Sequence, residues 1–64
     1  MSEVGPKLRE LREAAKLTQE DLAHEAGIST STLSRIERGT YQPRLDTLDK
    51  LAQALKVSVV ELLS

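Results

Sequence analysis

Apolar residues recur at intervals of three and four along most of this 64-residue chain, a pattern typical of amphipathic helices. The pattern predicts an all-α fold with five short helices and no sheet. Pro6 suits the first position of a helix that ends near Lys16, a fourth helix spans residues 45–55, and Ser58 caps a short last helix. The apolar residues of these three helices are Leu8, Leu11 and Ala15, then Leu48, Leu51, Ala52 and Leu55, and finally Val59, Val60, Leu62 and Leu63.

The start of the second helix is marked by a complete set of local signals. Thr18 is a good N-cap, and Asp21 stands three residues later, where the acid of a capping box belongs. Leu17 and Leu22 occupy the two positions of a hydrophobic staple. We therefore expect this helix to begin at Gln19.

The third helix carries similar signals at both of its ends. Ser29 is its N-cap, with Ile28 and Leu33 as the staple. Gly39 tolerates the positive φ that commonly ends a helix. The third helix is therefore predicted over residues 30–38.

A short turn at residues 26–28 joins the second helix to the third. Gly27 can adopt a left-handed conformation there without a steric penalty, so a β-branched residue at this position should not be tolerated. Two short helices this close together must cross each other, which is the arrangement of a helix-turn-helix. The second of them carries Thr30, Ser31 and Arg35 opposite its apolar residues, so its polarity suits contact with DNA.

Beyond this motif, the chain resembles the lambda-repressor-like, Cro/C1-type (XRE family) helix-turn-helix regulators of bacteria and phages. The segments that carry the resemblance are LRELREAAKLTQEDLAHEAGIS, STLSRIERG and QPRLDTLDKLAQALKVSVVELL, and together they cover almost the whole chain after Gly5. The resemblance implies a compact five-helix DNA-binding domain and the function of a small transcriptional regulator. We expect residues 1–64 to form this single domain, with residues 1–5 as a flexible N-terminal arm.

A helix that enters the major groove needs short or donor-bearing side chains at its leading end. The Arg35 guanidinium can bridge O6 and N7 of one guanine, while Thr30 and Ser31 offer hydroxyl groups and, for threonine, a methyl group. The resemblance implies that these three positions contact bases and that Gln19 contacts the DNA backbone. The alternative is that the serines and threonines only cap and decorate a surface helix.

Contacts to the DNA backbone are expected at the starts of the second and fourth helices and in the loop between the third and fourth. The family usually has a serine or threonine cap where this chain has Arg44, which weakens capping but supplies a cation for a phosphate. Arg38 and Tyr41 are equally consistent with solvated surface. The full set of candidates is Gln19, Thr32, Ser34, Arg38, Tyr41, Gln42 and Arg44.

The overall charge is not that of a strongly basic DNA-binding protein, since the net charge is −1 and the pI is about 5.7. Between residues 29 and 44, however, Arg35, Arg38 and Arg44 face only one acid, Glu37. One face of the domain can therefore be positive. So few cations predict modest affinity for a single copy and a shallow salt dependence.

The last segment holds more apolar surface than a short helix needs for its own packing. We expect Leu62 or Val57 to anchor it to the core and Val59, Val60 or Leu63 to form a two-fold contact with a second copy. Such a homodimer would set two recognition helices about 34 Å apart along the DNA. The alternatives are that all five residues pack internally, or that a longer natural protein continues beyond Ser64.

Arg12 and Glu37 hold positions at which relatives often pair an arginine of the first helix with a glutamate near the end of the recognition helix. The resemblance therefore implies a structural ion pair that locks the recognition helix in orientation. The alternative is two unrelated surface charges.

The remaining composition argues against catalysis. The chain has no cysteine, a single histidine at His24 and no catalytic triad, glycine-rich phosphate loop or metal-binding spacing. We therefore expect no enzyme activity, no cofactor, no metal, no membrane association and no small-molecule ligand, and we expect a cytoplasmic protein. The competing function is a protein-interaction module such as an antitoxin or accessory subunit, against which Arg35 and the polar third helix favour DNA binding.

Overall fold

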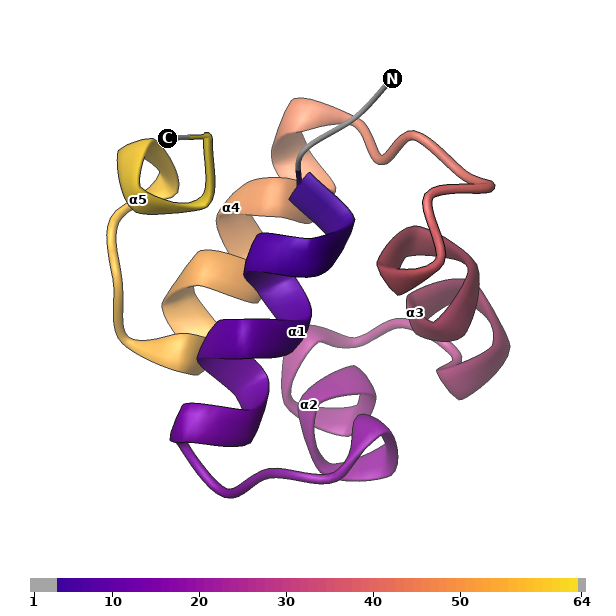
Figure 1. The fold of residues 1–64 in the computed structure, drawn as a ribbon, viewed down its shortest axis with the longest axis horizontal. Helices are drawn as coiled ribbons and strands as arrows, with labels where there is room; N and C mark the ends of the chain where they lie inside the picture. The colour runs from indigo at the N-terminus through magenta and orange to yellow at the C-terminus, as the bar shows by residue number, and fades with distance from the viewer. Residues whose placement is uncertain (1–3, 64) are drawn as a thin grey trace.

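The computed structural model describes residues 4–63, and all the regular structure in this range is helical. The helices are α1 (Val4–Ala14), α2 (Gln19–Ala26), α3 (Thr30–Glu37), α4 (Leu45–Leu55) and α5 (Val59–Leu63) (Figure 1). The predicted all-α, five-helix fold is therefore confirmed. None of the helices within residues 4–63 has the length and apolar character that crossing a membrane requires.

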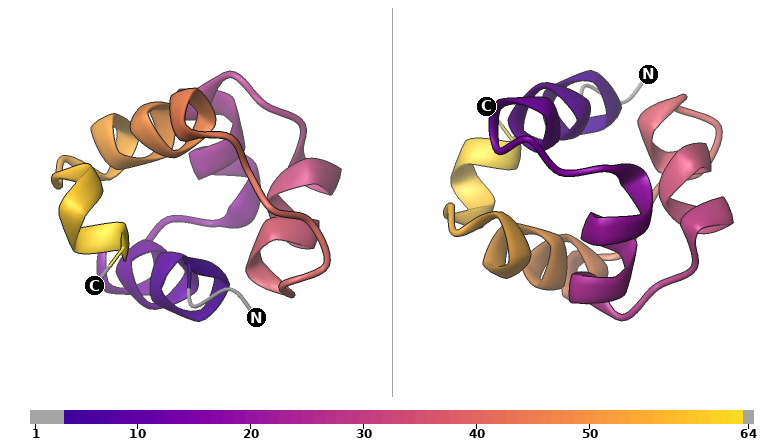
Figure 2. Two further views of the ribbon diagram at one scale, coloured as in Figure 1. Left: turned by 90° about the horizontal axis from the view of Figure 1, so that it is seen from above. Right: turned by 90° about the horizontal axis from the view of Figure 1, so that it is seen from below.

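The arrangement leaves α3 at the edge of the molecule. α2 packs against α4 and α3, while α1 packs against α3 and α5. Both views of Figure 2 show α3 at one side of the molecule and α5 at the other. The described chain measures only 25 × 22 × 20 Å, so a helix at the edge has one face toward the core and one toward solvent.

The core is aliphatic and draws on every helix. The fully buried large side chains are Leu8, Leu22, Leu33, Ile36, Leu51 and Leu62. All four residues of the stripe predicted for α4 are buried as well. Because α3 contributes Leu33 and Ile36 to this core, its orientation is fixed by hydrophobic packing.

The predicted capping box at the start of α2 is confirmed. The Thr18 Oγ1 accepts a hydrogen bond from the backbone N–H of Asp21 at 3.0 Å, and the Asp21 Oδ2 accepts one from the backbone N–H of Thr18 at 3.0 Å. The backbone N–H of Thr18 and its hydroxyl stabilise the carboxylate, which lowers the pKa of Asp21. At α3, the Ser29 Oγ accepts from the backbone N–H of Thr32 at 3.0 Å.

The turn between α2 and α3 needs glycine because of its backbone conformation. Gly27 has a φ of 72°, and its N–H donates to carbonyl oxygens in the last turn of α2. No atom lies within 4 Å of the place where a Cβ would stand, so lack of space does not explain the glycine. A β-branched residue would be strained at this φ, as predicted.

The start of α1 differs from the prediction. The helix begins at Val4 rather than Pro6, and both Val4 and Gly5 are buried, so the assignment of these two residues to a flexible arm is wrong. The reason is tertiary, since α1 passes so close to the end of α3 that a Cβ on Gly5 would stand 2.5 Å from the carbonyl oxygen of Ile36. Residues 1–3 of the predicted arm lie outside the described residues.

Candidate nucleic-acid interface

The two faces of α3 differ sharply in their side chains. Leu33 and Ile36 are 0% and 1% exposed and face the core. Thr30, Ser31 and Arg35 are all exposed, so the three candidate base contacts lie together on the outward side. Ser34 and Thr32 are half-buried at the margins of this side. The outward side of α3 is therefore polar and its inward side apolar. We call the exposed residues Thr30, Ser31 and Arg35 the polar ridge of α3.

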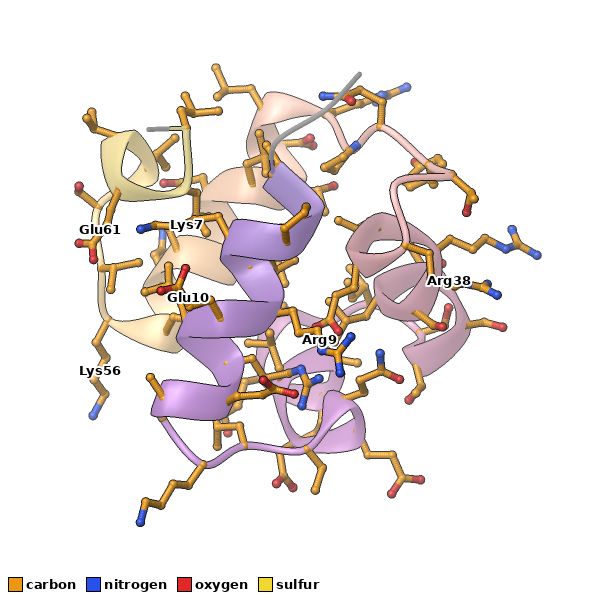
Figure 3. The ribbon with its side chains drawn as sticks, viewed as in Figure 1. Lys7, Arg9, Glu10, Arg38, Lys56 and Glu61 are labelled. Atoms are coloured by element: carbon orange, nitrogen blue, oxygen red, sulfur yellow. The ribbon has the colours of Figure 1, made fainter. Side chains whose placement is uncertain are left out.

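The arginines of α3 are available to an external partner. Neither Arg35 nor Arg38 takes part in the Arg9–Glu13 or the Arg12–Glu37 ion pair. Arg38 Nε donates to the Ser34 carbonyl oxygen at 3.3 Å, and its side chain extends from the end of α3 away from the other helices (Figure 3). A guanidinium without an internal carboxylate partner can bind a base edge or a phosphate.

The loop between α3 and α4 continues the polar surface. Tyr41 is 44% exposed, and Gln42 and Arg44 are also exposed. Arg44 is the N-cap of α4 but makes no side-chain capping hydrogen bond, as expected when an arginine replaces a serine or threonine. In the first turn of α4 the Asp46 Oδ1 accepts from the backbone N–H of Thr47 at 2.9 Å, and Arg44 sets an exposed cation just before this turn.

Arg12 and Glu37 form the ion pair that the resemblance implied. Arg12 Nε lies 2.7 Å from Glu37 Oε2, Arg12 Nη2 donates to Glu37 Oε1 at 3.1 Å, and Arg12 Nη1 donates to the Leu17 carbonyl oxygen at 2.8 Å. The two side chains are 11% and 4% exposed. The hydrogen bonds to Glu37 raise the pKa of Arg12. This bidentate pair ties the end of α3 to α1.

Gln19 has a contact that the sequence did not predict. Its Nε2 donates to Glu37 Oε1 at 3.0 Å. The carboxylate of Glu37 therefore accepts hydrogen bonds from α1, through Arg12, and from α2, through Gln19. Gln19 and Glu37 are 18 residues apart, and no local pattern could have indicated that they meet.

The apolar residues of α5 divide between the core and the surface. Leu62 is 0% exposed, whereas Val60 and Leu63 are 72% and 55% exposed. Val59, a predicted dimer contact, packs in part against the core. Sequence reasoning missed Leu45, which is 67% exposed and lines an apolar groove together with Val59. Its position off the buried stripe of α4 was the signal that could have identified it.

A helix-turn-helix family model (HTH_3) matches residues 8–62. The chain belongs to this family of Cro/C1-type regulators. It is 48% identical over 65 residues to the HTH-type transcriptional regulator RghRB of Bacillus subtilis, a match that covers 100% of the chain and 47% of RghRB. It is also 45% identical over 56 residues to the immunity repressor of Bacillus phage phi105, covering 88% of the chain and 39% of the repressor. The chain thus spans less than half the length of either relative.

Solved structures of regulators share the fold. The restriction-modification controller protein C.AhdI from Aeromonas hydrophila superimposes with a TM-score of 0.91 and 42% identity, covering 92% of this chain and 89% of C.AhdI. SinR, a master regulator for biofilm formation crystallised in complex with DNA, has a TM-score of 0.91 and 34% identity, covering 95% of this chain and 98% of the SinR chain.

Proposed function

We propose that this chain is a sequence-specific double-stranded DNA-binding domain of a transcriptional regulator, and that it acts by binding rather than by catalysis. The observation that supports this most directly is the polar ridge of α3, with Thr30, Ser31 and Arg35 exposed while Leu33 and Ile36 hold the helix from behind. Its family and its likeness to SinR, solved with DNA, agree with this function. Such a regulator works where the genome lies, in the bacterial cytoplasm.

In this proposal α3 lies in the major groove. Arg35 binds a guanine edge, and Thr30 and Ser31 contact neighbouring bases. Thr32 and Ser34 touch the groove wall. The phosphates on either side are bound by Gln19 and by a second group of residues that extends from the end of α3 into α4, namely Arg38, Tyr41, Gln42 and Arg44.

The number of cations limits the electrostatic part of the binding free energy. If Arg38 and Arg44 each neutralise one phosphate, the logarithm of the binding constant should fall with the logarithm of salt concentration with a slope of about −2 per domain. This shallow slope separates the present domain from strongly basic binders, which make many more phosphate contacts.

We further propose that two copies associate through the exposed apolar residues at the α4–α5 end. Val60 and Leu63 extend from α5, and Leu45 lines the groove beside Val59. α5 lies on the other side of the molecule from α3 in Figure 2, so a contact made through Val60 and Leu63 leaves α3 uncovered. We propose a second copy of this chain as the partner because a dimer doubles the contacts to DNA, and one domain has few cations of its own.

Selection of bound sequences from a random double-stranded DNA pool at stated salt tests the function. We expect a two-fold symmetric consensus with half-sites about one helical turn apart. Arg35→Ala should lose about 1–3 kcal/mol of binding free energy and relax the preference at one base pair, whereas Arg44→Gln should weaken all sequences alike. Lys56→Gln, remote from α3 in Figure 3, is the matched charge control and should change neither. Failure of the natural chain to enrich any sequence would refute the function.

Sedimentation analysis tests the dimer separately. The natural chain should sediment as a dimer at high concentration, and a variant with Val60→Glu and Leu63→Glu should remain monomeric with its helical spectrum intact. A monomer at millimolar concentration of the natural chain would remove the dimer from the proposal without affecting DNA recognition by one domain.

A further inference from the structure

We infer that Glu37 is a positioning residue for DNA binding, which holds the Gln19 side chain in the orientation that a DNA phosphate requires. The inference rests on the proposed function and adds a residue that is itself barely exposed, since the Glu37 side chain is 4% exposed. Glu37 therefore acts on DNA only through Gln19.

The hydrogen-bonding capacity of Gln19 permits both contacts at once. Gln19 is the first residue of α2, at the end of the helix where backbone N–H groups have no intrahelical partner and favour an anion; that of Asp21 is bound by the Thr18 Oγ1. A side-chain amide nitrogen carries two hydrogens, and Nε2 directs one of them to Glu37 Oε1 at 3.0 Å. Its second hydrogen remains for a phosphate oxygen. Because Gln19 is only half-buried, this second hydrogen can reach an external partner.

Glu37 is itself rigidly held. The Arg12 guanidinium meets it with two hydrogen bonds, at 2.7 and 3.1 Å, and planar bidentate pairing fixes both partners in angle as well as in distance. Gln19 thus hydrogen-bonds to a fixed acceptor in the free protein. Its rotamer is selected before DNA arrives, so less side-chain freedom is lost on binding.

The hydrogen bond between Gln19 and Glu37 also couples the position of the Gln19 amide to that of α3. Glu37 is the last residue of α3, so a tilt of α3 moves the carboxylate and, with it, the Gln19 amide. A backbone contact made from α2 therefore depends on the placement of the helix that contacts the bases. Loss of Glu37 should weaken one particular phosphate contact and leave the others in place.

A double-mutant cycle on DNA affinity tests this dependence. Gln19→Ala alone should weaken binding to the selected operator about tenfold, the typical loss for a hydrogen bond to a charged group. In a Glu37→Gln background the same Gln19→Ala change should cost less than about twofold further, because a neutral carboxamide cannot pair bidentately with Arg12 and no longer holds the Gln19 amide in one orientation. Fully additive losses would overturn the inference.

Single methylphosphonate substitutions in the operator provide a readout that a purely structural role for Glu37 would not change. One neutralised phosphate should weaken the natural chain but not Gln19→Ala, and this identifies the phosphate that Gln19 binds. Glu37→Gln should lose sensitivity at that phosphate alone. If its sensitivity there persists while overall affinity drops, Glu37 only stabilises the fold and the inference is wrong.

Two further measurements test the inference even if Glu37→Gln folds poorly. An Arg12→Met, Glu37→Leu variant replaces the ion pair by apolar side chains, an exchange that other folds tolerate, and it should show the same loss at the same phosphate. In the natural chain, NMR should show one Gln19 side-chain amide proton protected before DNA is added and both protected afterwards. Loss of the first protection on DNA binding would overturn the inference.

The outcomes separate the two proposals. If the natural chain enriches no DNA sequence, the proposed function fails. If it enriches an operator but the cycle is additive, only the role of Glu37 fails.

Discussion

Replacing Gly5 with alanine should destabilise the fold, although alanine is the better helix former. A Cβ at this position would stand 2.5 Å from the Ile36 carbonyl oxygen and 2.8 Å from that of Glu37. Ordinary contacts begin at 3.4 Å, so α1 and α3 must separate by about 0.9 Å. Both obstacles are backbone atoms, which cannot turn aside as a flexible side chain would.

The size of the effect follows from two opposing terms. Overpacking of this kind costs about 1–3 kcal/mol, and the higher helix propensity of alanine offsets about 1 kcal/mol of it. We expect a net loss of up to about 2 kcal/mol in the free energy of unfolding. For a domain of this size each 1 kcal/mol lost lowers the melting temperature by roughly 4–8 °C.

Thermal and urea unfolding followed by circular dichroism measure this loss, and operator binding gives a second reading. Because α3 is displaced in Gly5→Ala, DNA affinity should drop even at a temperature at which the variant is fully folded. Gly27→Ala is the control for strain without overlap. Its strain comes from the backbone φ of 72°, and no atom lies within 4 Å of the added Cβ. A Gly5→Ala variant more stable than the natural chain, with unchanged affinity, would refute the close approach of α1 to α3.

Three other predictions concern side chains at helix ends and in the ion pair. Arg12→Ala or Glu37→Ala should each lose about 3 kcal/mol of unfolding free energy in urea titrations, whereas Arg12→Met combined with Glu37→Leu should lose far less; equal losses would contradict a desolvated pair. The lowered pKa of Asp21 stabilises the natural chain above about pH 4, and this contribution is lost as the pH falls through the pKa of the folded state. The free energy of unfolding of Asp21→Asn should therefore fall less steeply at acidic pH than that of the natural chain. Arg44→Ser should add a side-chain cap while weakening DNA binding, and the gain in thermal unfolding should stay below the usual value of about 1 kcal/mol because Asp46 already binds the Thr47 N–H. A variant that gains both stability and affinity would contradict the phosphate role of Arg44.

Most helix boundaries were predictable because their signals are local. Thr18 with Asp21, and Ser29 with the turn before it, define the starts of α2 and α3 within the segments themselves. The start of α1 was not predictable in this way. Val4 and Gly5 are buried, and Gly5 lies against the end of α3, more than thirty residues away along the chain, which periodicity cannot reveal.

Only part of the candidate interface was predictable from the sequence. The outward polar face of α3 follows from its own sequence, since Leu33 and Ile36 determine which side is buried. The Arg12–Glu37 pair was expected only from the resemblance to other regulators. The Gln19–Glu37 hydrogen bond depends on the packing of α2 against α3, whereas Leu45 could have been identified from its position off the buried stripe of α4.

The separation of the two faces of α3 has a consequence for how such a domain can change its target. Thr30, Ser31 and Arg35 are exposed, and exposed positions of this kind usually tolerate substitution within about 0.5 kcal/mol of stability. The residues proposed to contact bases can therefore be substituted with almost no effect on the fold that presents them. A library randomised at these three codons should yield mostly folded members, and new operator preferences can arise in it without compensating changes elsewhere.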